Sequence, residues 1–438
     1  MKKQLQIFLD FLRFCIGSAK EIPDSLKEVD WKEQYAIAKK QCLVGVLFDG
    51  IKTLSAEHVG MKKELLLQWM AESQMLEKTN VRLNDAAIQV SEWFRKKGFR
   101  TCVLKGQGNA LMYPNPYSRT PGDIDIWVEG GDKRVISFVR SISPHEKACY
   151  HHIEFPSYKG VEVEVHYRPS FLLCFWHNRK LQKYYERVKE EQFSHRVMLG
   201  EQGEIAIPTA EFNLIFQLTH IYAHLMNEGI GLRQLVDYFF VLKNTDFIGN
   251  TNGVSGNTNG VFGANTNCSD NTNRIGGNVD GDGFLLNTDF TDNTDKVGGN
   301  VDGDGFLVNT DLTDNTDRIG GNADGVDRRL LQDELRRLGL WEFAGAVMYI
   351  MKEVFGMPAS RLIVPPHEKY GKFVLNEVLE AGNFGKHDAR NRFGRSQLGH
   401  NLQRVYRDIR LVRYFPAEAL SEPIFRIWHF FWRCYQKR

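Results

Sequence analysis

Hydrophobic positions recur with helical spacing over most of the chain, and this pattern is interrupted in one central stretch. Helical periodicity predicts helices over residues 4–17, 31–54 and 61–97. After about residue 180 it returns and predicts helices over 180–193, 210–226, 231–243, 328–338, 342–355, 367–381, 397–413 and 418–436. Between these regions polarity alternates at every second residue, which is typical of half-buried strands.

The alternating stretch predicts a small sheet. Thr101–Leu104 is a short apolar run, and Asp123–Val128 and Val161–Tyr167 alternate with a period of two. Residues 151–155 add a further strand. A small mixed sheet set between helical segments indicates an α+β fold.

Two of these strands carry acidic residues on one face. In a strand, Asp123 and Asp125 project from the same side, and so do Glu162, Glu164 and His166. If the strands are neighbours, up to four carboxylates meet on one surface, where a cation would relieve their repulsion. Such hard oxygen ligands suit Mg²⁺, and two such ions can clamp the oxygens of a phosphoryl transfer. The alternative is the wet face of an antiparallel sheet, which also alternates apolar and polar residues.

A glycine-containing turn, Lys105-Gly106-Gln107-Gly108, lies upstream of the aspartates and opens a helix. Backbone N–H groups at the start of a helix can bind phosphate. The same four residues are also compatible with an ordinary turn.

The composition is that of a globular protein, and the charge is unevenly distributed. The chain has 438 residues, 42% of them hydrophobic, and no window approaches the roughly 18 apolar residues of a membrane span. Seven scattered cysteines without a CxxC pair indicate a reducing compartment, so we expect a cytoplasmic protein. Residues 244–327 hold 14 Asp and three basic residues, a net of −11, which leaves +13 for the other residues. That surplus suits an anionic partner such as a nucleotide or nucleic acid, or serves only solubility.

Residues 244–327 form an Asn/Gly/Asp-rich insert with a repeat of 22 residues, seen in the copies that start at Ile275 and Val297. Two copies have the ligand spacing of an EF-hand loop and resemble the calcium loops of dockerin modules. The candidate calcium ligands are Asn278, Asp280, Asp282, Asp289, Asn300, Asp302, Asp304 and Asp311. The asparagine at the first position and the poor helix formers after each loop favour a polar loop without a ligand. The expected domains are 1–98, 99–180, 181–243 and 328–438, with the insert at 244–327 between the last two.

Several motifs together resemble a known family. The run from Val103 to Val128, which contains the turn and the aspartate pair, resembles the bacterial nucleotidyltransferase-like family described as uncharacterised, in the DNA polymerase β nucleotidyltransferase superfamily. Glu162–Arg168 resembles its third motif, and Gly229–Asp237 resembles its helical motif after the sheet.

The resemblance implies a transfer of a nucleoside monophosphate from an NTP to an acceptor hydroxyl, with Mg²⁺ or Mn²⁺ as cofactor. Asp123 and Asp125 match the pair that holds both metals, and Glu164 matches the third carboxylate, which ligates the catalytic metal and helps activate the acceptor. Gly106 matches the glycine that admits the triphosphate, while Gln107 departs from the usual small residue. Phosphate contacts are also expected from Lys105, Gln107 and Arg119.

The remaining candidates lie around this predicted centre. His220 and His224 are four residues apart on a helix, but no third ligand is evident, which disfavours zinc and favours a place beside the nucleotide. Arg233 and Asp237 have the spacing of a helical ion pair. Glu162 and His166 are expected next to the metal ligands. The alternatives to an enzyme are a degenerate nucleotide- or partner-binding scaffold and a calcium-dependent interaction protein. We expect no membrane partner, and a nucleic-acid acceptor stays open.

Overall fold

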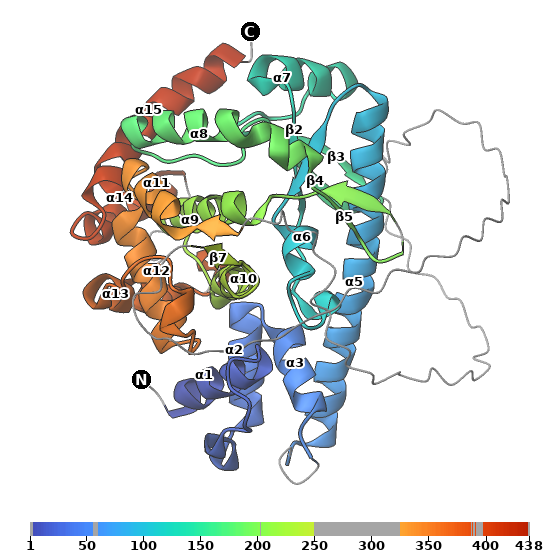
Figure 1. Cartoon of the computed structure of the whole chain (residues 1–438), viewed down its shortest axis with the longest axis vertical. Helices are drawn as coiled ribbons and strands as arrows, with labels where there is room; N and C mark the ends of the chain where they lie inside the picture. The colour runs from blue at the N-terminus through green and yellow to red at the C-terminus, as the bar shows by residue number, and fades with distance from the viewer. Residues whose placement is uncertain are drawn as a thin grey trace, which may run out of the picture. The chain divides into compact units, whose positions relative to one another are not determined.

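The computed structural model describes residues 3–55, 60–201, 203–248, 325–386, 388, 390 and 397–436. These residues belong to one compact unit, which is formed by Met1–Ile248 and Thr310–Arg438. The candidate calcium ligands between Asn278 and Asp311 lie outside the described residues. A small mixed sheet surrounded by many helices confirms the predicted α+β fold (Figure 1).

Short helices open the described chain. They are α1 (Lys3–Cys15), the 3-10 helix η1 (Asp24–Glu28), α2 (Trp31–Gln41) and α3 (Val44–Lys52). The prediction of one helix over 31–54 is wrong, because Cys42 adopts a left-handed backbone conformation with φ 55° and ends α2. Asp30 caps the start of α2, since its side chain accepts hydrogen bonds from the backbone N–H groups of Lys32 and Glu33.

A long helix, α5 (Lys63–Lys96), runs beside the sheet (Figure 1). Its 34 residues confirm the predicted long helix, and its second half buries Leu83, Val90 and Phe94. α5 contacts the first two strands and so covers part of one face of the sheet.

The sheet has four strands in the order β1-β2-β4-β3. They are β1 (Thr101–Leu104), β2 (Ile124–Val128), β3 (His152–Tyr158) and β4 (Val161–His166). β2 and β4 pair in parallel, whereas β1 and β3 are antiparallel to their neighbours. The helix α7 (Gly131–Ile142), which the sequence analysis missed, connects β2 to β3. The predicted neighbourhood of the two acidic strands is therefore confirmed.

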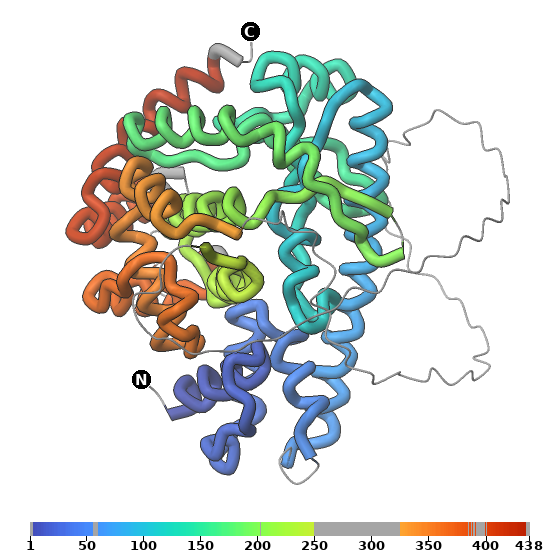
Figure 2. Tube along the Cα trace, in the orientation of Figure 1, coloured from blue at the N-terminus to red at the C-terminus, as the bar shows by residue number. Residues whose placement is uncertain are grey.

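The second half of the described chain is mostly helical, as predicted. It contains α8 (Phe175–Ser194), α9 (Ala210–Asn227), α10 (Leu232–Lys243), α11 (Arg328–Arg337), α12 (Trp341–Glu353), α13 (Glu368–Ala381), α14 (Gln397–Leu411) and α15 (Pro416–Gln436). The short elements of the described chain are α6 (Gly106–Ala110) and η2 (Pro116–Ser118), which lie between β1 and β2, and β5 (Arg196–Met198), β6 (Glu204–Ala206), β7 (Phe247–Ile248), β8 (Val326–Asp327), η4 (Ala359–Arg361) and η5 (Asn383–Gly385) in the second half. The trace in Figure 2 shows the last helices beside segments from the middle of the chain, and α14 packs against α9.

The two ends that flank residues 249–324 are adjacent. β7 and β8 form a short parallel pair, and the backbone N–H of Val326 donates to the carbonyl oxygen of Asp246 at 2.7 Å. Among the described helices, none combines the length and the apolar character needed to cross a bilayer.

Candidate active site

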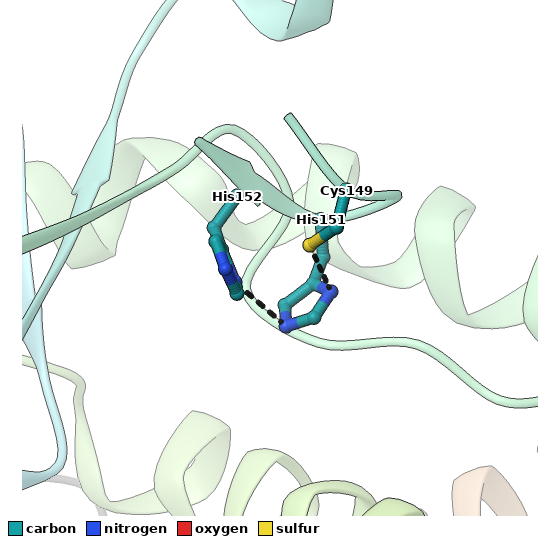
Figure 3. Close-up of side chains that lie close together, drawn as sticks. All are labelled: Cys149, His151 and His152. Carbon is teal, nitrogen blue, oxygen red and sulfur yellow. Dashed lines mark hydrogen bonds between the residues drawn. The ribbon is translucent and has the colours of Figure 1, made fainter. Parts of the chain in front are cut away.

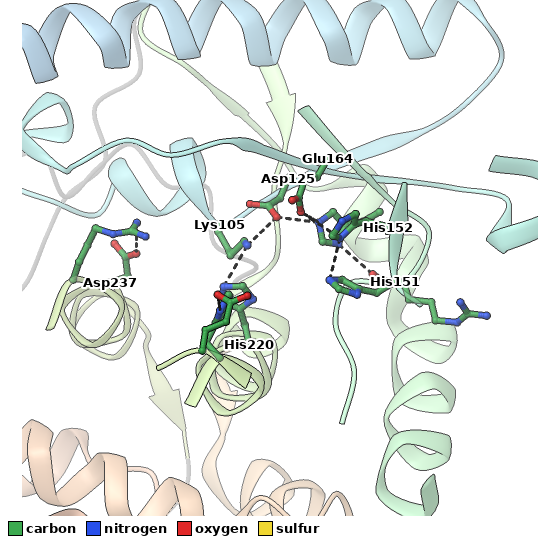
Figure 4. A network of polar contacts seen from close by, with 12 residues as sticks. Lys105, Asp125, His151, His152, Glu164, His220 and Asp237 are labelled. Atoms are coloured by element: carbon green, nitrogen blue, oxygen red, sulfur yellow. Dashed lines mark hydrogen bonds and ion pairs between the residues drawn. The ribbon is translucent and has the colours of Figure 1, made fainter. Parts of the chain in front are cut away.

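The parallel register of β2 and β4 brings the predicted carboxylates together. Asp125 lies directly beside Glu164 across the two strands, and Asp123 immediately precedes β2. One carboxylate oxygen from each of the three residues lies within 4.8 Å of the others. Figure 4 shows Asp125 and Glu164 side by side at the centre of a polar network. The three side chains could therefore hold one divalent cation.

Asp125 is buried and already has two cationic partners. The Lys105 Nζ lies 2.8 Å from its Oδ1, and the His166 Nε2 lies 2.9 Å from the same oxygen. Burial by itself would raise the pKa of Asp125, but the Lys105 ammonium and the His166 hydrogen bond outweigh it and hold the pKa well below its usual value. Asp125 is therefore ionised at neutral pH.

Asp123 is a weaker acid than its neighbour. The negative charge of Asp125, followed by burial, raises the pKa of Asp123 to about 6. For Glu164, burial opposes ionisation, but the hydrogen bond with His166 and the charge of His152 lower the pKa. The cluster thus combines two carboxylates of lowered pKa with a third that loses its proton only near neutral pH.

The turn before α6 places Lys105 and Gly106 at this site. Lys105 has φ 52° and ψ −139°, which a residue with a Cβ adopts only at a cost of about 1–3 kcal/mol. Gly106 follows with φ 44°, and a Cβ built there would meet only the Asp123 carbonyl oxygen at 3.9 Å. The strained turn aims the Lys105 ammonium at Asp125 and leaves open space above Gly106.

Gln107 does not face the site. Its side chain is buried, and its amide donates a hydrogen bond to Asn84 Oδ1 on α5. The next residue, Gly108, packs closely on Ile207. The structure thus places Gln107 in the packing of α6 on α5, away from the predicted phosphate contact.

Three imidazoles pack beside the carboxylates. The His151–His166 and His152–His166 ring centroids are 5.3 and 5.2 Å apart, and His152 Nδ1 lies 3.3 Å from Glu164 Oε2. Although burial disfavours the charged ring, Asp125 and Glu164 raise the pKa of His166 to about 9. Burial and the charge of His166 lower the pKa of His152 to about 4. One imidazolium and neutral imidazoles therefore line the same wall.

The sequence analysis missed part of this wall. Cys149 Sγ lies 3.5 Å from His151 Nδ1, and His151 Nε2 lies 3.1 Å from His152 Nδ1 (Figure 3). These three residues are also close enough to hold a metal ion. Their spacing in the sequence matches no recognised metal-binding motif. The signal that the sequence offered was their position at the start of a strand whose partner strand carries Glu164.

The helical motif forms the opposite wall. His220 Nε2 lies 3.3 Å from Lys105 Nζ, and His224 lies 3.4 Å from Glu228. Arg119 forms a buried, two-pronged ion pair with Asp237, with nitrogen–oxygen distances of 2.8 and 2.9 Å. The predicted Arg233–Asp237 pair is present at 3.8 Å. The Arg119 guanidinium thus holds η2 and α10 together at the edge of the site.

These walls enclose a cavity of about 680 Å³. Beyond the residues already named, the C-terminal helical segment contributes Lys386, Arg404, Phe425 and His429 to the lining, none of which the sequence analysis singled out. Glu162 is exposed and does not line the cavity, although it shares a strand with Glu164. The cavity therefore combines a carboxylate cluster, imidazoles and cations, which is a setting for an anionic ligand bound through a metal.

Comparisons with known proteins agree with this geometry. A family model described as an uncharacterised nucleotidyltransferase matches residues 27–251, about half of the chain, including the three carboxylates, and this is the comparison that bears on the site. A solved structure found by the structural comparison is an antigenic nucleotidyltransferase-like protein from Paracoccidioides brasiliensis, with 12% identity, a TM-score of 0.23, and coverage of 37% of this chain and 76% of that chain. We draw no inference from a structural likeness this weak. The comparison with curated proteins gives no match.

Proposed function

The chain belongs to the family of uncharacterised nucleotidyltransferases, and on that premise we propose that it transfers a nucleoside monophosphate from an NTP to an acceptor hydroxyl with the help of Mg²⁺ or Mn²⁺. The observation that carries this proposal is the meeting of Asp123, Asp125 and Glu164 in one cavity with Lys105. A bound divalent cation would supply positive charge that offsets these carboxylates and the substrate phosphates.

In this proposal Lys105 and Gly106 receive the triphosphate. The backbone at Gly106 admits a phosphate group because no side chain fills the space there. Lys105 exchanges its contact with Asp125 for a phosphate oxygen, which its short distance and flexible stem allow. His220, next to Lys105 and held neutral because burial and the Lys105 charge lower its pKa, positions the ammonium.

The acceptor side of the reaction falls to Glu164 and His152. The Glu164 carboxylate accepts the hydrogen bond of the acceptor hydroxyl and takes up its proton, and the neutral His152 imidazole, 3.3 Å away, holds the carboxylate in place. The acceptor oxygen forms a bond to the α-phosphorus, the bond between the α-phosphorus and the bridging oxygen breaks, and pyrophosphate leaves. Sites built this way act mainly by positioning and charge.

Labelled nucleotides test the proposal. The full chain is incubated with a cell extract, Mg²⁺ or Mn²⁺ and each NTP, labelled in separate samples at the α- or the γ-phosphate. We expect label on an acceptor from the α-labelled NTP only. Transfer of the γ-label would indicate a phosphotransferase instead, and no transfer with retained NTP binding would favour a degenerate binding scaffold.

The matched control uses two glutamates of one strand. Glu164→Gln should lose the transfer, whereas Glu162→Gln, two residues away and exposed outside the cavity, should retain it. Equal activity of both variants would remove Glu164 from the reaction.

A further inference from the structure

The outer faces of α14 and α15 are strongly apolar. Ten of the twenty large hydrophobic residues that are exposed in the described chain belong to these two helices. A monomeric protein rarely exposes so many apolar side chains in one place. This concentration indicates a surface that another molecule covers.

α15 has two different faces. Its inner stripe turns toward the cavity or is buried and consists of Glu418, Glu422, Phe425 and His429. Its outer stripe consists of Leu420, Ile424, Ile427 and Phe431, which are between 62% and 70% exposed. The two stripes have the same spacing and are offset by two residues, or about 200° around a helix, so they lie on opposite sides.

α14 continues the outer surface. Leu402, Val405 and Ile409 are exposed on it, while Asp408 and Leu411 face inward. Arg426 of α15 donates to the side chain of Asn401 on α14, and Glu422 of α15 lies next to Asp408 of α14, so the two helices run antiparallel and side by side. We call these seven outer residues the α14–α15 face.

The spacing within this face is that of helix-to-helix packing. Successive outer residues on α15 are four, three and four positions apart, and those on α14 are three and four apart. This is the heptad spacing of residues that interlock with a facing helix. The α14–α15 pair of another copy has the same spacing and would therefore provide matching helices.

We propose that a second copy of the chain covers the α14–α15 face, so that the two helix pairs form a four-helix bundle about a two-fold axis. Together with the exposed Tyr406, Trp428 and Phe430 on the same two helices, the seven residues of the face are about half exposed and present roughly 800–1,000 Å² of surface. A standard stable interface needs about 800 Å² from each partner. An isologous pairing matches the face to itself.

Charge is compatible with this pairing. The acidic residues of α14 and α15 are Asp408, Glu418 and Glu422, and all three are at most 8% exposed. Closing the interface would therefore bury no additional carboxylate, which avoids a large desolvation penalty. Since the inner stripe of α15 lines the cavity, the pairing would also fix one wall of the candidate active site. The inference does not depend on the proposed reaction.

The test is the mass of the full chain in solution, measured by light scattering after size-exclusion chromatography. We expect a dimer for the wild type at micromolar concentration and a monomer for the variant with Ile424→Asp and Ile427→Asp. The matched control is Leu330→Asp on α11, where the leucine is 67% exposed outside the face, and it should remain a dimer. Circular dichroism verifies that each variant is folded, and Leu402→Asp on α14 provides an independent disruption.

A monomeric wild type, or a dimer that survives both disruptions, would overturn the proposal. A second arm uses vesicles of phosphatidylcholine with or without phosphatidylglycerol. If the wild type is a monomer that sediments with vesicles through Ile424 and Ile427, the face serves a lipid surface and not a second copy.

Discussion

Lys105 Nζ and Asp125 Oδ1 lie 2.8 Å apart, so the candidate active site neutralises its own central carboxylate with a lysine. An ammonium cannot occupy the position of a metal ion on the same oxygen. A cation that bound through the same oxygen would displace the Lys105 ammonium, and a triphosphate would offer the ammonium new oxygen partners. In the proposed function this contact would couple metal binding to nucleotide binding.

This coupling predicts an unusual effect of Lys105→Met. Without nucleotide, the variant should bind Mn²⁺ roughly ten-fold more tightly or better, because the competing ammonium is gone (about 1.4 kcal/mol per ten-fold). With NTP, turnover should fall because a phosphate contact is lost. Calorimetric titration with Mn²⁺ measures the first effect, and weaker Mn²⁺ binding in the variant would contradict the competition.

Asp125→Asn should abolish transfer while leaving the fold intact. The amide fills the same space but supplies no charge, so we expect turnover to fall by at least about a thousandfold, since a metal supplies several kcal/mol of stabilisation. Kinetics with α-labelled NTP and a thermal melt of the same preparation check both parts. Unchanged turnover would remove Asp125 from the metal site.

The raised pKa of Asp123 predicts how the stability of the folded protein depends on pH. The charge of Asp125 and burial raise its pKa to about 6 in the folded protein, above the usual value of about 4 in the unfolded chain. The folded state thus binds the proton more tightly, and its stability falls as the pH rises from about 4 to about 6. Relative to Asp123→Asn, the wild type should lose on the order of 2 kcal/mol across this range. Urea unfolding at several pH values tests this, and parallel profiles for the two proteins would refute it.

The Arg119–Asp237 pair should be a structural element. Both side chains are at most 5% exposed, so Arg119→Met leaves a buried carboxylate without its main partner and should cost about 3–5 kcal/mol of unfolding free energy. Arg95→Met is the control, because Arg95 pairs with Glu92 on the surface, where solvent screens the pair, and should contribute little to the stability. Similar losses in the two variants, measured by urea unfolding, would argue against a special role for the buried pair.

Replacing residues 249–324 with a short Gly/Ser linker should preserve the fold. β7 and β8 already hold the two ends side by side, so a short connection closes without strain. We expect a cooperative melt and the Mn²⁺ affinity of the full chain. Insolubility, or loss of the Mn²⁺ site, would show that this segment supports the rest of the protein.

The sequence predicted most elements because amphipathic spacing marks helices and strands directly, but it could not fix which residues meet. Alternation placed Glu162 and Glu164 on one face, yet β2 begins at Ile124 beside Val163, so no residue of β2 lies opposite Glu162. The register of the strand pair decides which residues lie opposite each other, and the periodicity of hydrophobic residues does not predict that register.

Other residues of the site depend on tertiary contacts. Gln107 turns to Asn84 because α6 packs on α5. Cys149, His151 and His152 join the carboxylates because β3 pairs with β4, and Arg404 and Phe425 arrive from the far end of the chain. The local spacing of residues in the sequence predicts none of these tertiary contacts.

Mn²⁺ binding with and without a non-hydrolysable NTP analogue tests the central claim most directly, because it needs no knowledge of the acceptor. We expect the analogue to tighten Mn²⁺ binding by roughly ten-fold or more in the wild type, since its phosphates supply missing oxygen ligands and draw Lys105 from Asp125. Asp125→Asn should show no such gain. An Mn²⁺ affinity that the analogue leaves unchanged in the wild type would contradict the account of Asp123, Asp125 and Glu164 as a nucleotidyltransferase metal site.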